Sequence, residues 1–140
     1  MYTFSKKSID KLETCHNDLY KIASEAIKNS PYDFGISYGH RTPDEQRDLY
    51  LKGRNGNPGK IVTYCDGYLK KSKHNYLPSL AFDFICYING KLTWEDSVYL
   101  EVGLHIMEVA EQLFEDGEID NMISWGGNWK KFKDLGHIQI

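Results

Sequence analysis

Two short segments, far apart in the sequence, contain side chains that could bind a metal ion. The first carries His74 and Asp83, and the second, near the end of the chain, carries Asp134 and His137. A catalytic zinc ion takes three protein ligands from His, Asp, Glu or Cys and leaves a fourth position for water. We therefore expect His74, Asp83 and His137 to bind one zinc ion, with Asp134 as the base acting on the bound water.

Each of these residues also has a plainer interpretation. Asp83 lies between two phenylalanines in an apolar run, and a carboxylate buried there without a partner would be unfavourable. A metal ion would offset that cost, but so would an arginine or a helix N-terminus. His74 by itself is equally consistent with a solvated loop histidine. The pair Asp134 and His137 favours the metal, because this spacing lets the imidazole reach an ion while the carboxylate reaches the open position.

Other polar residues have two readings as well. Arg41 precedes an expected helix start, where its guanidinium could hold a substrate carboxylate, stabilise an oxyanion or form a salt bridge. We expect His16 and His105 to be structural, since both fall at or beside apolar helix positions. His40 is a candidate for lining the cleft.

Charge and composition limit the function classes. The chain of 140 residues is 41% hydrophobic and 26% charged, which is typical of one soluble globular domain. The net charge of −3 argues against a nucleic-acid-binding protein. Two basic clusters flank the proposed metal motifs and could attract an acidic substrate or simply be solvated loop edges: Lys70, Lys71 and Lys73, and Lys130, Lys131 and Lys133.

No segment indicates export or membrane insertion. The longest apolar runs are far too short for a membrane span, and the N-terminus lacks the features of a secretory signal. We therefore expect synthesis in a cytoplasm and free thiols. Cys15, on an expected helix, and Cys86, in an expected strand, are predicted to be buried, whereas Cys65 falls in a polar loop.

The first half of the chain predicts two helices, a strand and a long loop. Apolar residues recur at helical spacing over Ser8–Asn29, with Ser8 as the N-cap. Residues 34–38 read as a strand. Thr42, followed by proline and then by Glu45, predicts a helix start with a capping box, and this helix should end near residue 53. The polar, glycine-rich residues 54–73 are interpreted as a rim or lid of the cleft.

The second half predicts a hairpin, a long helix and two final strands. Residues 81–88 read as a strand, Asn89-Gly90 is a strong hairpin turn signal, and residues 91–94 should form the partner strand. A helix is expected from about residue 95 to 114, then strands at 122–125 and 136–140. The fold class is therefore α+β, with two long helices packed on a small, mostly antiparallel sheet and the zinc site in a cleft at the sheet.

The order of these residues resembles the zinc peptidases that cut peptides containing D-amino acids. These include bacterial D-alanyl-D-alanine carboxypeptidases and dipeptidases, and phage endolysins that act as L-alanyl-D-glutamate endopeptidases. The shared pattern is Ser72-x-His74, Ala81-x-Asp83 and Asp134-x-x-His137. The resemblance to the endolysin branch covers nearly the whole chain and includes Arg41-Thr42-x-x-x-Gln46, Trp125-Gly126-Gly127-x-Trp129 and Gly136-His137-x-Gln139.

The resemblance implies roles for individual residues. It implies one Zn²⁺ on the three ligands named above, Asp134 as general base, and Arg41 near the scissile carbonyl. Gln46 and Ser72 are expected to support the site or to contact substrate, and Trp129 to form part of the rim or a substrate contact. The family usually has six residues between the first His and the Asp, whereas here there are eight, so the extra pair, Pro78-Ser79, must bulge out if both ligands are to meet one metal.

The expected function is a zinc-dependent endopeptidase, an endolysin that hydrolyses the L-Ala–D-Glu bond of peptidoglycan stem peptides during host cell lysis. We expect residues 1–140 to form a single catalytic domain with no cell-wall-binding module, acting as a monomer without nucleic acid or stable membrane association. It should wait in the host cytoplasm until a holin-type protein gives it access to the periplasmic wall. The alternatives are a D,D-carboxypeptidase on the same scaffold and a non-catalytic zinc-binding module.

Overall fold

The centre of the fold is a five-stranded antiparallel sheet built around β2 (Ala81–Ile88), as seen in a computed structural model that describes residues 1–140. On one edge β2 pairs with β1 (Asp33–Tyr38). On the other edge it pairs with β3 (Lys91–Thr93) and β5 (His137–Gln139), and β4 (Ser124–Trp125) pairs with β5. The predicted α+β class and the antiparallel sheet are confirmed, although the last two strands are shorter than predicted.

The β2–β3 hairpin forms where the sequence predicts it. Asn89 and Gly90 both have positive φ angles, 51° and 78°, which a tight two-residue turn between twisted strands requires. In β2, Phe82, Phe84 and Cys86 alternate into the core. The hairpin therefore follows from local turn chemistry together with the period-two pattern of the strand.

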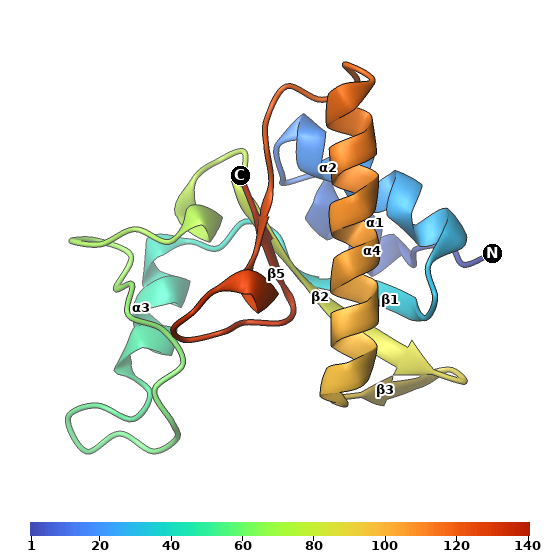
Figure 1. Ribbon diagram of the computed structural model, residues 1–140. Helices are drawn as coiled ribbons and strands as arrows, with labels where there is room; N and C mark the ends of the chain where they lie inside the picture. The colour runs from blue at the N-terminus through green and yellow to red at the C-terminus, as the bar shows by residue number, and fades with distance from the viewer.

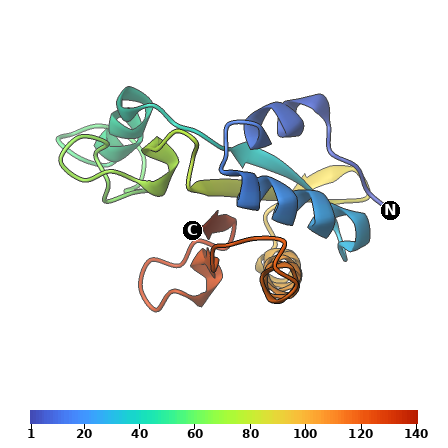
Figure 2. The ribbon, with the colours of Figure 1, turned by 90° about the horizontal axis from the view of Figure 1, so that it is seen from above.

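One long helix, α4 (Asp96–Glu115), packs against the sheet and against α2 (Asn17–Ala26). Its buried stripe includes Val98, Val102 and Ile106, spaced as predicted. Figures 1 and 2 show α3 (Pro43–Leu51) past the end of the sheet where β2 begins, and in Figure 2 α4 is seen end-on. No helix has both the length and the apolar character needed to cross a membrane.

The predicted helix over Ser8–Asn29 is wrong as a single element. The chain forms α1 (Lys6–Leu12), a break, α2 and a short 3-10 helix, η1 (Ile27–Asn29). The break arises because the Ser79 backbone pairs with it: Ser79 N donates to Thr14 O at 2.8 Å, and His16 N donates to Ser79 O at 2.9 Å. After the break His16 caps α2, and at the start of α1 the cap is Ser5 rather than Ser8.

The helix after Thr42 and the loop that follows it agree with the sequence. The Thr42 hydroxyl accepts from Glu45 N at 3.1 Å, and the Glu45 carboxylate accepts from Thr42 N at 3.1 Å, so the predicted capping box is present. After α3, residues 52–72 form no helix or strand. We call this segment the long loop. It leads into the 3-10 helix η2 (Lys73–Asn75), which precedes β2.

Candidate active site

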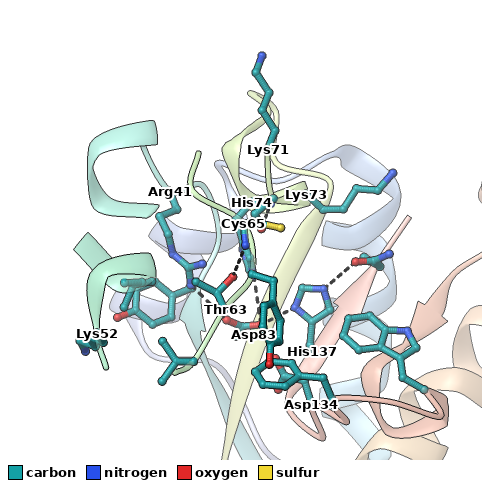
Figure 3. Close-up of a pocket in the computed structure, with 18 residues that line it drawn as sticks. Arg41, Lys52, Thr63, Cys65, Lys71, Lys73, His74, Asp83, Asp134 and His137 are labelled. Atoms are coloured by element: carbon teal, nitrogen blue, oxygen red, sulfur yellow. Dashed lines mark hydrogen bonds and ion pairs between the residues drawn. The ribbon is translucent and has the colours of Figure 1, made fainter. Parts of the chain in front are cut away.

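Three side chains that could hold a metal ion converge at the end of the sheet. One potential ligand atom from each of His74, Asp83 and His137 lies within 4.8 Å of the others. His74 Nε2 is 3.2 Å and His137 Nδ1 is 2.9 Å from the same oxygen, Asp83 Oδ1. Figure 3 shows the two rings pointing at the carboxylate between them. The structure thus brings together the three residues that the sequence proposes as ligands.

The backbone places each of these side chains. Asp83 on β2 is directly opposite His137 on β5, and directly opposed residues of an antiparallel pair project from the same face. His74 comes from η2, whose N-cap is Ser72. The Ser72 hydroxyl accepts from His74 N at 3.2 Å, and the Asn75 side chain accepts from Ser72 N at 2.8 Å. Ser72 therefore holds the turn that carries His74.

The outer nitrogen of each imidazole has its own hydrogen-bond partner. His74 Nδ1 lies 2.8 Å from the Gly39 carbonyl oxygen, and His137 Nε2 lies 2.9 Å from Gln139 Oε1. Both partners accept, so in neutral rings these nitrogens carry the protons and the inner nitrogens present lone pairs to Asp83 Oδ1. Lone pairs that converge in this way need a cation between them, either a proton, in which case the ring nitrogen donates to Asp83, or a metal ion. Zinc-binding histidines are oriented in this way, so the residues present fit a metal ion.

The electrostatics of the three residues agree with a cation site. Burial by itself would raise the pKa of Asp83, but the hydrogen bonds from His137 and His74 outweigh it and hold the pKa well below the usual carboxyl range. Burial by itself would lower the pKa of His137, but the hydrogen bond to Asp83 outweighs it and raises that pKa. A charged carboxylate between two imidazoles is the donor set that zinc prefers.

Arg41 is buried beside the three residues and held from several sides. Its Nη2 is 3.5 Å from Asp83 Oδ2, and its guanidinium carbon is 4.5 Å from the centre of the Tyr38 ring. Its Nη1 donates to Gln46 Oε1 at 2.8 Å, while Nε has no partner. Arg41 thus forms the salt bridge considered as its alternative role and also lines the cleft.

Gln46 has the first of its two expected roles, which is to support the site. It is fully buried, its oxygen accepts from Arg41, and its nitrogen donates to Thr63 Oγ1 at 3.2 Å and to the Cys65 carbonyl at 2.9 Å. Because every polar atom of the amide is occupied away from the cleft, Gln46 does not present a substrate contact. It connects Arg41 to the long loop instead.

The site opens into a cleft of about 440 Å³. One wall comes from the long loop and η2, and the other from residues 129–139, so the prediction that the long loop forms a rim is confirmed. The two walls touch where the Tyr64 and Phe132 rings meet edge to face, 5.2 Å between centroids. The Trp129 ring lies 5.2 Å from the His137 ring and lines the cleft with Ser72.

Asp134 also lines this cleft. The residue is exposed as a whole, but partial burial of its carboxyl, and then the negative charge of Asp83, raise its pKa. Its carbonyl accepts from His137 N at 3.2 Å, and its own N–H donates to Gly126 O at 3.2 Å. A Cβ atom at Gly126 would lie 2.2 Å from the main-chain carbonyl oxygen of Asp134. Because Gly126 has no side chain, the segment that carries Asp134 can pack against it.

The remaining histidines and cysteines lie outside the metal cluster. His40 does not line the cleft, since its Nδ1 is 2.9 Å from the Tyr76 carbonyl. His16 and His105 are structural, as predicted, because one caps α2 and the other bonds to the Ala26 carbonyl at 2.8 Å. The three cysteines are free, but Cys15 lies in the break between α1 and α2 rather than on a helix.

The two extra residues between His74 and Asp83 are accommodated as a closed loop. Leu80 N donates to Lys73 O at 3.0 Å, which joins the two ends of the loop. Leu77 at its tip is 72% exposed, so the chain does bulge outward, but Ser79 turns inward and is fully buried. The bulge predicted at Pro78-Ser79 is therefore centred slightly earlier, and His74 still reaches Asp83.

Sequence reasoning gave no role to two groups that complete the site, the Gly39 carbonyl and the Gln139 side chain. Gln139 had a usable signal, because residues two apart on a strand share a face and Gln139 follows His137 by two on β5. The Gly39 carbonyl had none, since a main-chain acceptor leaves no mark in the sequence.

Comparison with known proteins gives the family. Residues 1–139 match the family model described as phage L-alanyl-D-glutamate peptidase. The chain belongs to this family. It is 36% identical over 126 residues to the peptidoglycan L-alanyl-D-glutamate endopeptidase CwlK of Bacillus subtilis, an alignment covering 82% of this chain and 65% of that protein. This chain thus spans just under two thirds of that relative's length.

Two further proteins are similar over almost the whole chain. The L-alanyl-D-glutamate peptidase of Escherichia phage T5 is 31% identical over 140 residues, covering 99% of this chain and 89% of the phage protein. The crystal structure of the Serratia marcescens L-Ala D-Glu endopeptidase ChiX superposes with a TM-score of 0.74 at 24% identity, covering 99% of this chain and 90% of that one. The structural likeness supports the fold, and the predicted family is confirmed.

Proposed function

We propose that this chain is a zinc-dependent peptidase that hydrolyses the L-Ala–D-Glu bond of peptidoglycan stem peptides. Family membership supports the bond, and one observation supports the metal: two anchored imidazoles and a carboxylate direct their lone pairs to one point. His74, Asp83 and His137 would hold the ion. Bound zinc supplies Lewis acidity and lowers the pKa of a coordinated water to about 7.

Asp134 is the proposed general base and acid. It lies in the same cleft, and its raised pKa makes its carboxylate a stronger proton acceptor than an ordinary aspartate. It would take the proton of the attacking water and return it to the amine of the leaving D-Glu residue. Both transfers use one carboxyl group on the wall that also carries His137.

Arg41 is the proposed stabiliser of negative charge on the scissile carbonyl oxygen. Its guanidinium is fixed by Gln46 and the Tyr38 ring, so little reorganisation is needed when charge develops on the carbonyl oxygen. Trp129 and Ser72 line the cleft and are proposed to contact the peptide. Gln46 is proposed to position Arg41.

The proposed setting follows from the same family. We propose that residues 1–140 act as one catalytic domain and as a monomer on bacterial peptidoglycan during phage lysis. In that setting the enzyme depends on a separate holin-type protein to pass from the host cytoplasm to the wall. The family model's phage origin and the phage T5 relative support this setting.

The test is digestion of purified peptidoglycan fragments followed by mass spectrometry. The zinc-loaded protein should release peptides that begin with D-Glu, and removing zinc with a chelator should abolish this activity until zinc is restored. Asp134→Asn should bind zinc normally but cleave poorly. Release of only the terminal D-Ala, with the L-Ala–D-Glu bond intact, would instead identify a D,D-carboxypeptidase.

A further inference from the structure

Charge is distributed very unevenly over this molecule. Residues 95–120, which contain α4 and the turn after it, hold nine Asp and Glu residues and no Lys or Arg. All nine are exposed, and none takes part in an ion pair. The other parts of the chain hold all 17 Lys and Arg residues and only 11 acidic residues. A segment of charge −9 therefore faces solvent in a protein whose remainder carries +6.

The positive charge is concentrated on the two walls of the cleft. Residues 52–73 contain six Lys and Arg residues against a single acid, Asp66, whose Oδ1 is occupied by the N–H groups of Tyr68 and Lys70. Residues 126–136 contain three lysines against Asp134. We call these two segments the basic walls. None of their lysines or arginines forms an ion pair, since the paired lysines are Lys6 and Lys28 elsewhere.

Of the two basic walls, the long loop lies on the opposite side of the molecule from α4, whereas residues 126–136 lie beside α4, where Lys133 and Asp96 line one hollow. In Figure 1 the sheet lies between α4 and the long loop. Lys52, Lys71 and Lys73 line the cleft itself, and Figure 3 shows Lys71 and Lys73 extending outward from its edge. The Lys71 ammonium group is near only the exposed Tyr76 ring, 5.5 Å from its centre. These charges are therefore available to a ligand that enters the cleft.

We propose that the basic walls bind free carboxylates of the substrate, and that they make the enzyme select peptides whose D-Glu residue keeps a free carboxylate beside the cleaved bond. This inference rests on the proposed function. A glutamate joined to the next residue through one carboxyl keeps its other carboxyl, so the residue after the scissile bond is anionic unless it is amidated. Lys52, Lys71 and Lys73 line the cleft that this residue would enter, and Lys71 and Lys73 extend from its edge.

The proposed attraction between the basic walls and the substrate carboxylates should affect binding more than the chemical step. A single exposed ion pair contributes little, but several like charges around a cleft raise the local concentration of an oppositely charged substrate. The effect should therefore appear in KM rather than in kcat, and it should disappear at high salt because screening shortens the range of the interaction.

The test compares two peptides that differ only in the free carboxylate of D-Glu, one ionised and one amidated. For the zinc-loaded protein at about 0.02 M salt, we expect the amidated peptide to show a KM about five- to tenfold higher with kcat within about twofold, and the difference to vanish near 1 M salt. The double variant Lys52→Gln/Lys71→Gln should raise KM for the ionised peptide to about the same extent and raise KM for the amidated peptide less, because that peptide keeps only its other carboxylates.

Matched controls and a binding assay make the result decisive. Lys7→Gln/Lys91→Gln removes the same charge from two exposed lysines outside the cleft and should behave as wild type. Calorimetric binding of the product peptides, which begin with ionised or amidated D-Glu, tests the inference without catalysis. If wild type cleaves neither substrate, the proposed function fails, whereas preferential binding of the ionised product would still support the basic walls.

Two results would overturn the inference. One is equal KM and equal product binding for the ionised and amidated peptides. The other is displacement of the ionised peptide by an oligonucleotide of the same charge at the same concentration, which would show a surface for anions in general rather than for carboxylates.

Discussion

The Gln139 side chain offers a direct test of the proposed metal site that does not depend on activity. Its Oε1 lies 2.9 Å from His137 Nε2 and fixes the proton there, so that Nδ1 faces Asp83 with a lone pair. In Gln139→Leu that acceptor is lost. The proton can then move to Nδ1, where it bonds to Asp83 and blocks the lone pair needed for the metal. Loss of such a partner weakens metal binding about 10- to 100-fold.

The measurement is zinc affinity by competition with a chromophoric chelator, starting from metal-free protein. Gln139→Leu should bind zinc about 10- to 100-fold more weakly than wild type, which is about 1.4–2.7 kcal/mol of binding free energy. Gln139→Glu keeps an acceptor and should bind at least as tightly as wild type. Gln112→Leu makes the same change on exposed α4, where the amide contacts only Asp116, and should leave affinity unchanged.

The reasoning would be refuted by a Gln139→Leu protein that is folded by near-ultraviolet circular dichroism and binds zinc as tightly as Gln112→Leu. That result would mean that the Gln139 hydrogen bond does not set the state of His137. Weak binding by Gln139→Glu as well would point to a steric cause instead, because glutamate preserves the acceptor and nearly the same shape.

Three further predictions concern the base, the support of Arg41 and acid stability. Asp134→Asn should lower kcat about 10²- to 10⁴-fold with zinc content unchanged. In wild type, kcat/KM should fall as the pH drops below the raised pKa of Asp134. A pH–rate profile in which kcat/KM falls only at the ordinary carboxyl pKa would contradict the role of Asp134 as base. Gln46→Leu should lower kcat about 10- to 100-fold, because Arg41 loses its hydrogen-bond partner. A normal kcat for this variant would show that Gln46 does not position Arg41. Burial by itself would raise the pKa of Asp18, but hydrogen bonds from Asn121 and neighbouring N–H groups lower it. The stability that Asp18 gives the folded protein is therefore complete above pH about 4, the unfolded-state pKa, and is lost as the pH falls through the lower folded-state pKa. Urea titrations should show Asp18→Asn less stable by about 1–3 kcal/mol at pH 7, with the difference shrinking toward pH 2, and a pH-independent difference would contradict this origin.

Elements with strong local signals could be read from the sequence. Thr42 with Glu45 formed the predicted capping box, and Asn89-Gly90 formed the predicted turn. The stripe of α4 and the alternation of β2 were also read correctly. In each case the residues that decide the conformation lie within a few positions of one another, so no knowledge of the tertiary fold is needed.

The break between α1 and α2 could not be read in this way. Helical periodicity runs on through residues 13–16, and no proline or glycine interrupts it. What breaks the helix is the backbone of Ser79, which bonds to Thr14 and His16 from more than 60 positions away. The prediction of Ser8 as a cap was also wrong, because Ser5 accepts from Ser8 N at 3.3 Å, while the Ser8 hydroxyl is buried and accepts from Ile36 N at 3.0 Å.

In the candidate site, too, some residues could be predicted from the sequence and others depended on contacts in the folded chain. The types and spacing of His74, Asp83 and His137 were enough to propose them as ligands, and the structure brings them together. The sequence left two roles open for Gln46, because a polar residue on a helix face gives no indication of whether it meets substrate or the interior. Its true surroundings, Arg41 on one side and the long loop on the other, exist only in the folded chain.

Two kinds of constraint hold the site together, and they explain how it tolerates extra residues. Asp83 and His137 are fixed by strand register, since a slip of one residue would turn His137 to the opposite face. Arg41 and His74 come from loops, but these loops are joined to each other: Arg41 N donates to His74 O at 2.8 Å, and Asn75 Nδ2 donates to Arg41 O at 3.0 Å. Arg41, proposed to stabilise charge, and His74, proposed to bind the metal, therefore keep their relative positions. Because the bond from Leu80 N to Lys73 O closes the intervening loop at its base, the two extra residues lengthen the tip of the loop and leave His74 in place.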